Sequence, residues 1–171
     1  MISEKILIVD DEKTVCDSVN KIFSRKGYTV EDSLNASEAL EKMKKTSYDL
    51  VITDMKMPGI GGLELLELVK DYYPELEVIL ITGYPSADTA DKAKELGAAD
   101  YISKPFTPDE LIETAERALK KRKRLEEEIQ KIGKEEKEEY DIRSKALDIA
   151  VRWDNKPENI IEMMHDIQSE F

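Results

Sequence analysis

Short runs of Ile, Val and Leu alternate with longer stretches of helical periodicity along most of the chain, and this alternation constrains the fold more than any other feature. Apolar runs without polar alternation are typical of parallel strands that are covered on both faces. We therefore predict an α/β protein in which helices cover both faces of a parallel sheet. Five runs have strand character, and the fifth is the shortest: residues 5–9, 28–31, 49–53, 77–81 and 100–102.

Glycine and proline residues mark the junctions between these runs and the helical stretches. Gly27, Pro74, Gly97 and Pro108 stand where a helix begins or ends, and the segment 58–62 contains a proline and several glycines. Right-handed crossovers between successive strands then give a doubly wound sheet. Ligands bind such sheets at the carboxyl ends of the strands where the winding direction changes, so we expect the functional site there.

Length and composition narrow the classes of function. The 171 residues suffice for one domain of ordinary size and a smaller extension. A net charge of -12, from 38 acidic and 26 basic residues, disfavours nucleic acid and anionic membranes as partners. Cys16 is the only cysteine, which excludes an intramolecular disulfide, and no apolar run approaches the roughly 20 residues that cross a bilayer. We expect a soluble, cytoplasmic protein that acts through protein partners.

Three carboxylates follow two of the predicted strands. Asp10 and Asp11 come directly after the first strand, and Asp54 comes directly after the third. At adjacent strand ends these charges would repel one another, and a hard divalent cation removes that repulsion. Oxygen ligands with several retained waters suit Mg²⁺, so the sequence predicts a magnesium site. Taken alone, the Asp10-Asp11 pair is equally compatible with a helix N-cap.

Two further polar side chains fall at the same edge of the predicted sheet. Thr82 ends the fourth strand, and Lys104 follows the fifth, just before Pro105. A hydroxyl, an ammonium and a metal ion around one carboxylate supply the charge and hydrogen bonds that phosphoryl transfer needs. Asp54 would be the in-line nucleophile and would form an acyl phosphate. Taken singly, the residues after Asp54 are also compatible with a turn, and Thr82-Gly83 with a strand end.

Together and in this order, these motifs resemble the receiver domain of two-component response regulators: Asp10-Asp11, Asp54, Met57-Pro58-Gly59, Thr82 and Lys104-Pro105. The resemblance covers residues 3–124. It implies a flavodoxin-like α/β fold, with a doubly wound parallel sheet of five strands in the order 2-1-3-4-5. It also implies phosphorelay signalling, in which Asp54 receives a phosphoryl group from a sensor histidine kinase or a phosphotransfer protein.

The resemblance implies roles for the residues around the acceptor. Asp10, Asp11 and Asp54 would hold Mg²⁺, together with the backbone carbonyl of Lys56. In this family the side chains at the positions of Lys56 and Tyr84 flank the path of the hydrolytic water. We therefore expect them to tune the lifetime of the acyl phosphate.

The resemblance also assigns the phosphoryl-binding and switch residues. Lys104 would pair with the phosphoryl oxygens, and the Lys104-Pro105 peptide bond would be cis. Thr82 and Tyr101 would form the switch pair, because a phosphoryl group draws the Thr82 hydroxyl inward and leaves space for the Tyr101 ring. The surface from the fourth to the fifth helix would then change and be read by a partner. Without the resemblance, Tyr101 on a short strand is more typical of a half-buried packing residue.

Two other classes of function compete with this interpretation. A Mg²⁺-dependent phosphohydrolase also forms an aspartyl phosphate, but it uses a second Asp two positions after the nucleophile, where this chain has Lys56. We therefore expect no enzyme, only self-phosphorylation and slow self-dephosphorylation. A constitutive scaffold that ignores phosphate would have no use for the acidic cluster.

Residues 125–171 differ in character from the receiver-like residues 1–124, and we interpret them as a helical extension. The basic block 120–124 is followed at once by acidic residues and by no DNA-binding module, so it is read as a solvated helix end. An apolar seam favours a short coiled coil and a homodimer, although Arg122 interrupts it and Gly133 weakens its end: Ala118, Leu125, Ile129 and Ile132.

Beyond the seam we expect a helical hairpin, formed by residues 140–153 and a helix that starts near Pro157. Residues 156–171 also resemble the helical start of the thioredoxin-like iron-sulfur subunit of NADH dehydrogenases and hydrogenases, but lack its cluster-binding cysteines. This likeness implies that the chain is the front of a longer protein whose output domain follows. Trp153 lies among apolar positions of the extension, which favours packing or a partner surface. His165, the sole histidine, is expected at the surface of an amphipathic helix, and we assign it no function.

Overall fold

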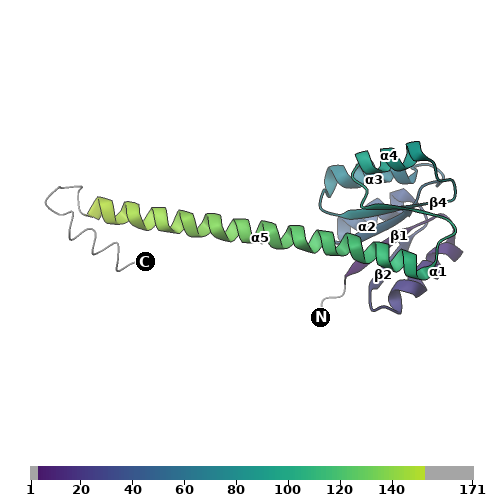
Figure 1. Cartoon of the computed structure of the whole chain (residues 1–171), viewed down its shortest axis with the longest axis horizontal. Helices are drawn as coiled ribbons and strands as arrows, with labels where there is room; N and C mark the ends of the chain where they lie inside the picture. The colour runs from purple at the N-terminus through teal and green to yellow at the C-terminus, as the bar shows by residue number, and fades with distance from the viewer. Residues whose placement is uncertain (1–3, 153–171) are drawn as a thin grey trace. The chain divides into compact units, whose positions relative to one another are not determined.

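The computed structural model describes residues 4–152, and its N-terminal part is a parallel sheet with helices on both faces (Figure 1). The strand order is β2-β1-β3-β4-β5, which confirms the predicted fold class. The strands are β1 (Lys5–Val9), β2 (Thr29–Ser33), β3 (Leu50–Asp54), β4 (Glu77–Thr82) and β5 (Asp100–Ser103). The helices are α1 (Lys13–Ser24), α2 (Ala36–Lys45), α3 (Gly62–Tyr72), α4 (Ala87–Glu95) and α5 (Pro108–Arg152).

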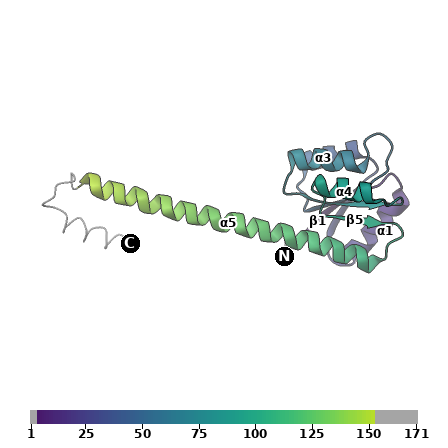
Figure 2. The ribbon, with the colours of Figure 1, turned by 45° about the horizontal axis from the view of Figure 1, so that its top comes forward.

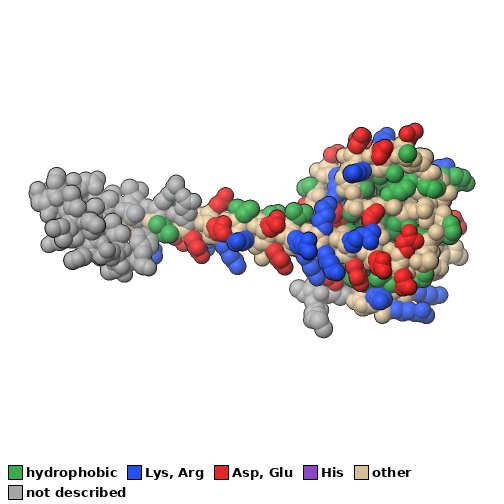
Figure 3. Space-filling model, in the orientation of Figure 1, with side chains coloured by type: hydrophobic (Ala, Val, Ile, Leu, Met, Phe, Trp, Pro, Cys, Tyr) green, Lys and Arg blue, Asp and Glu red, His purple; other side chains and the backbone are tan. Residues whose placement is uncertain are grey.

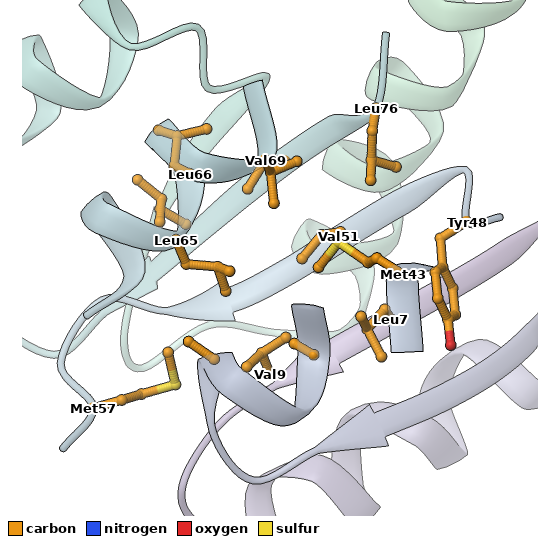
Figure 4. Close-up of a cluster of buried hydrophobic side chains, with 14 of the residues drawn as sticks. Leu7, Val9, Met43, Tyr48, Val51, Met57, Leu65, Leu66, Val69 and Leu76 are labelled. Carbon is orange, nitrogen blue, oxygen red and sulfur yellow. The ribbon is translucent and has the colours of Figure 1, made fainter. Parts of the chain in front are cut away.

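Side chains along each strand alternate between two separate core layers. Leu7, Val51 and Leu80 point into the layer beneath α2, α3 and α4, part of which is drawn in Figure 4. Ile6 and Ile52 point into the opposite layer, beneath α1 and α5. Figure 2 shows α3 and α4 on one side of the sheet and α1 on the other. Because each central strand is covered on both faces, its sequence has no polar alternation.

Strands β3 and β5 extend one residue beyond their predicted ends, and β4 ends at Thr82 as predicted. Asp54 pairs with Ile81 in the β3–β4 ladder, and Thr82 pairs with Ser103 in the β4–β5 ladder. Asp54 and Ser103 are therefore, like Thr82, the last residues of their strands rather than members of the loops that follow. Strand positions hold a backbone more firmly than loop positions, so the sheet itself orients the side chains of Asp54 and Thr82.

The basic block 120–124 is solvated as predicted, apart from the part-buried Arg122, but it is not a helix end because α5 continues beyond it. Three consecutive cations, residues 121–123, pair with Glu77, Asp49 and Glu4 at the amino-terminal edge of the sheet. The nitrogen-to-oxygen distances are 3.4 Å for the first pair and 2.7 Å for the second. Figure 3 shows Lys and Arg side chains gathered on this part of α5. The sequence indicated the exposure of the block but not these pairs, because the acidic partners lie far away in the sequence.

Helix α5 continues without interruption through Gly133 to Arg152, which corrects the expectation of a separate helix over 140–153. A glycine costs a helix interior only about 1 kcal/mol relative to alanine. Strong helix formers flank Gly133, and a pair between Lys131 and Glu135 at 3.8 Å spans it. These contributions are enough to carry the helix through one unfavourable residue.

The chain divides into two compact units, Met1–Lys123 and Arg124–Phe171. We call the first the sheet unit, and we call residues 124–152 of the second the α5 extension. The division falls one residue before the predicted boundary. Five large apolar side chains of the α5 extension are exposed, as the green side chains along the helix in Figure 3 illustrate: Leu125, Ile129, Ile132, Tyr140 and Ile142.

Several predictions concern residues that the structure does not describe. The second arm of the proposed hairpin, the likeness of residues 156–171 to an iron-sulfur subunit, and the interpretations of Trp153 and His165 all lie outside residues 4–152. Within the described part of the chain, no helix is both long enough and apolar enough to span a membrane.

Candidate functional site

Asp54 lies at the carboxyl end of β3 and is held from two sides. Its Oδ1 is 2.6 Å from the Lys104 ammonium, and its Oδ2 accepts a hydrogen bond of 2.7 Å from the backbone N–H of Lys56. The residue is only 8% exposed. The two bonds therefore fix the orientation of the Asp54 carboxylate. The Lys104 ammonium also places a positive charge beside it, where it can stabilise further negative charge.

Asp10, at the end of β1, shares the same ammonium. Its Oδ2 is 3.3 Å from Lys104 Nζ, and its Oδ1 accepts a hydrogen bond of 2.9 Å from the Glu12 backbone N–H. Burial raises the pKa of Asp10, and the Glu12 bond and the Lys104 charge only partly offset that effect. Burial alone would lower the pKa of Lys104, but its bonds with Asp54 and Asp10 outweigh burial and raise it. Lys104 thus stays charged between two carboxylates.

The predicted magnesium ligands are only partly brought together. Asp10 and Asp54 converge on Lys104, whereas the Asp11 side chain is exposed. Among residues 4–152, no three Asp, Glu, His or Cys side chains are grouped so that they could hold a metal ion. The donor chemistry nevertheless fits Mg²⁺, because two buried carboxylates share a single ammonium and one excess negative charge remains between them.

Lys104 and Thr82 are joined through the backbone. The Lys104 N–H donates to the Thr82 carbonyl at 2.7 Å, and the Lys104–Pro105 peptide bond is cis, as the resemblance implies. The Thr82 side chain is buried, and its hydroxyl oxygen accepts a hydrogen bond of 3.1 Å from the Tyr84 N–H. Thr82 therefore lies at the predicted edge of the sheet, with its hydroxyl bound to the loop before α4.

Lys56 and Tyr84 form an exposed pair beside Asp54. The Lys56 ammonium lies 3.9 Å from the centre of the Tyr84 ring, within the range of a cation–π interaction. The loops that carry these two residues follow β3 and β4, the strands that carry Asp54 and Thr82. The two positions predicted to flank the path of the hydrolytic water are thus in contact with each other.

Tyr101 is half-buried and has a partner that the sequence did not reveal. Its hydroxyl lies 3.0 Å from the hydroxyl of Thr89, in the first turn of α4. Thr89 also forms a capping box with Ser86, the residue before the helix. The pattern Ser86-x-x-Thr89 is a helix-start signal that could have been recognised, but its contact with Tyr101 depends on the tertiary fold.

One of the glycines that mark the junction at 58–62 fixes the loop after Asp54. Gly62, the first residue of α3, donates its N–H to the Met55 carbonyl at 2.9 Å. A Cβ atom on Gly62 would lie 2.8 Å from the Met55 Cα atom, closer than real side chains approach. Only glycine lets α3 begin this close to the backbone of Asp54 and Met55.

Comparisons with known proteins agree with this geometry. Residues 6–116 match the family described as the response regulator receiver domain. The chain is 38% identical over 119 residues to the sporulation initiation phosphotransferase F of Bacillus subtilis (strain 168), a match that covers 70% of this chain and 96% of that relative. Among seven further curated relatives, the matched region spans only 24% to 53% of their length.

Solved structures with the same fold include two receiver domains. A receiver domain protein (CheY-like) from Methanospirillum hungatei JF-1 has a TM-score of 0.69 and 34% identity, covering 72% of this chain and 98% of its own. The receiver domain of NtrX from Brucella abortus has a TM-score of 0.64 and 40% identity, covering 67% of this chain and 98% of its own.

Proposed function

Because this chain belongs to the response regulator receiver domain family, we propose that Asp54 is its phosphoryl acceptor in phosphorelay signalling. One observation carries this assignment: the buried Asp54 carboxylate is bonded to the Lys104 ammonium, which Asp10 shares. An acid at this place has a fixed nucleophilic oxygen and a neighbouring cation for the incoming charge. Apart from Asp54 and Asp10, no carboxylate in residues 4–152 is paired with Lys104.

The proposed reaction moves one phosphoryl group between two proteins. An Asp54 carboxylate oxygen attacks the phosphorus of a phosphohistidine in line with the breaking bond, so that a P–O bond forms and the P–N bond breaks. The imidazole of the kinase or phosphotransfer protein leaves with the electron pair of that bond. Lys104 then pairs with phosphoryl oxygens, which accept its hydrogen bonds in place of Asp54.

Mg²⁺ fits the remaining charge of the site. Asp10 and Asp54 would hold the ion, with Asp11 and the Lys56 carbonyl as the further ligands that the family resemblance implies. When bound, the ion neutralises negative charge on the phosphoryl oxygens. Lys104 keeps its own role, because its ammonium bridges Asp10 and Asp54 and thereby limits their mutual repulsion.

The phosphorylated state would be read through Thr82 and Tyr101. A phosphoryl group on Asp54 offers oxygen acceptors to the Thr82 hydroxyl, which now accepts from the Tyr84 N–H. Movement of Thr82 toward them leaves room for the Tyr101 ring beside β4, and the surface between α4 and α5 changes. This surface would present the signal to a downstream protein or output domain.

The Lys56–Tyr84 pair would set the lifetime of the acyl phosphate on Asp54. The pair stands beside the acceptor, and in this family these positions flank the route of the attacking water. The chain is accordingly a signalling domain that releases its phosphate slowly, not a phosphohydrolase. Multiple turnover of a small phosphate ester at an enzyme-like rate would contradict this proposal.

Intact-mass spectrometry tests the assignment of Asp54. Incubation of the full chain with acetyl phosphate and Mg²⁺ is expected to add one phosphoryl group, and Asp54→Asn is expected to add none. Asp49→Asn is a matched control, because Asp49 is bonded to Arg122 at the opposite edge of the sheet. Phosphorylation of Asp54→Asn equal to that of the unmodified protein would overturn the proposal.

We also propose that the α5 extension makes the protein a homodimer. Ile129 is 67% exposed and Ile132 is 55% exposed, and both belong to the seam predicted from the sequence. Such side chains on one helix gain stability when a second helix covers them. Light scattering of the full chain should give a dimer mass, and Ile129→Gln should shift it to the monomer. A monomer mass for the unmodified protein at all concentrations would refute this idea.

A further inference from the structure

We propose that Thr89 is a positioning residue that holds the Tyr101 hydroxyl at the first turn of α4 until Asp54 is phosphorylated. The two hydroxyl oxygens are 3.0 Å apart, and the two residues come from different elements, α4 and β5. This inference rests on the proposed function, because it assigns a partner to the switch residue Tyr101. It adds Thr89 as a residue that stabilises the position of Tyr101 in the unphosphorylated protein.

The surroundings of Tyr101 favour the hydrogen bond with Thr89 as the contact that fixes its ring. The ring is half-buried against the core layer beneath α2, α3 and α4, so it lies neither in solvent nor in the interior. Thr89 is also partly buried, which shields their hydrogen bond from water. A partly shielded hydroxyl pair contributes more than a fully exposed one, since water competes less for it. Inward movement of Tyr101 must break this bond.

The bond also links Tyr101 to the capping box of α4. The Thr89 hydroxyl oxygen lies near four polar atoms, namely the N, O and Oγ of Ser86 and the hydroxyl of Tyr101, at 3.3, 3.0, 2.8 and 3.0 Å. A threonine hydroxyl has one donor and two acceptor positions. Four neighbours therefore compete for three positions, and Tyr101 competes with the Ser86 hydroxyl for Thr89.

We call the hydrogen bond between the Thr89 and Tyr101 hydroxyls the latch. Because of this competition, another hydrogen bond can replace the latch when it breaks. When Tyr101 leaves, the Ser86 hydroxyl can take the vacated position on Thr89, so Thr89 is not left unpaired. The first turn of α4 then changes its bonding at the same moment as the ring moves. Tyr101 borders two surface depressions, one lined largely by alanines near α4 and one rich in carboxylates near α5. Release of the latch thus alters a side chain that both depressions share.

A double-mutant cycle on the full chain tests the latch. The probe is beryllofluoride with saturating Mg²⁺, and the readout is the midpoint of the titration followed by the amide resonances of Gly83 and Lys104. Thr89→Val removes one net hydrogen bond from the starting state and should lower the midpoint about fivefold. In a Tyr101→Phe background, which already lacks the bond, Thr89→Val should change the midpoint less than about twofold.

Two further variants separate the latch from a general effect on α4. Ser86→Ala removes the capping hydroxyl but leaves Thr89 available to Tyr101, so its midpoint should equal or exceed that of the unmodified protein. Thr89→Ser retains the hydroxyl and should restore the unmodified midpoint. An equal fall in midpoint for Ser86→Ala and Thr89→Val would overturn the latch, as would an undiminished effect of Thr89→Val in the Tyr101→Phe background.

Failure of the latch and failure of the proposed function give different results. If Asp54 is not the acceptor, the unmodified protein shows no saturable response to beryllofluoride, and no variant changes that. If only the latch is wrong, the unmodified protein responds and Asp54→Asn does not, while the effects of Thr89→Val and Tyr101→Phe simply add. A non-additive cycle with an intact response supports both.

Discussion

One helix, α5, has two different environments on the two sides of residue 123. In the sheet unit its apolar side chains Ala118 and Leu119 are each 5% exposed. In the α5 extension Leu125 is 47% exposed and Ile129 is 67% exposed. The helical pattern is continuous across this point, so the difference lies in what the rest of the chain provides. The sheet covers the first part, whereas Leu125 and Ile129 of the second part are exposed.

The contrast teaches which interactions hold each part in place. Residues of the sheet unit are fixed by a two-layer core and by long-range pairs such as Arg122 with Asp49. The α5 extension has local contacts between neighbouring turns, such as the pair of Lys131 with Glu135. Equivalent substitutions should therefore have large effects in the sheet unit and small or opposite effects in the α5 extension.

The largest expected effect comes from a glycine of the sheet unit. In Gly62→Ala the new Cβ comes closest to the Asp54 carbonyl oxygen and meets the Met55 Cα atom at 2.8 Å, and these are backbone atoms that cannot move aside as a flexible side chain can. We expect a loss of about 3 kcal/mol in the free energy of unfolding, measured by urea denaturation. Gly83→Ala is the matched control, because nothing lies within 4 Å of its Cβ position. Equal stabilities of the two variants would show that the loop after Asp54 is not tightly held.

Alkaline pH should weaken the sheet unit through its buried thiol. Burial, followed by the charges of Asp10 and Asp32, raises the pKa of Cys16 from 9.0 to about 11. Because this pKa is higher in the folded protein than in the unfolded chain, the thiol's contribution is complete below pH 9 and is lost as the pH rises to about 11. The loss amounts to at most about 3 kcal/mol, since the shift is two pKa units and one unit corresponds to about 1.4 kcal/mol.

Cys16→Ala isolates this contribution from the other groups that ionise in the same range. The variant is less stable than the unmodified protein near neutral pH, because it loses a fully buried side chain. Its deficit should shrink between pH 9 and pH 11 when urea unfolding is followed at several pH values. A deficit that stays constant over this range would mean that the thiol does not titrate as the structure indicates.

An intermediate effect should follow from the cations of α5. Arg122 lies 2.7 Å from Asp49 and 3.0 Å from the Tyr48 carbonyl, and its side chain is only 16% exposed. Arg122→Met should lower the free energy of unfolding by about 1.5 kcal/mol, because it leaves a carboxylate and a carbonyl without this partner. Lys131→Met in the α5 extension should change it by less than about 0.5 kcal/mol, since that pair is exposed. Similar losses for both would remove the distinction between the two parts of α5.

The sequence predicted what depends on local order along the chain. Strand ends are local features, so the positions of Asp10, Asp54, Thr82 and Lys104 at one edge of the sheet followed from five apolar runs and a known handedness of connection. The ladder pairs that extend β3 through Asp54 sharpen this prediction without changing it.

The sequence could not predict which residues far apart along the chain contact each other. Arg122 and Asp49 are 73 positions apart, and neither residue type indicates the other. Thr89 and Tyr101 meet only because α4 and β5 pack side by side, and the exposed position of Asp11 depends on side-chain direction after the end of β1. A charged block or a lone hydroxyl has many possible partners in the sequence. The distances in the folded structure decide which of them it contacts.

An effect of the opposite sign is expected at Gly133, the glycine of the α5 extension. Gly133 lies inside α5, and nothing is within 4 Å of its Cβ position. Gly133→Ala should therefore stabilise the helix by up to about 1 kcal/mol, because alanine loses less backbone entropy and meets no obstacle. Far-UV circular dichroism should show a helical signal that persists to higher temperature, while phosphorylation of Asp54 is unchanged. A destabilised Gly133→Ala would mean that another chain approaches the helix at Gly133, as a tightly packed dimer would require.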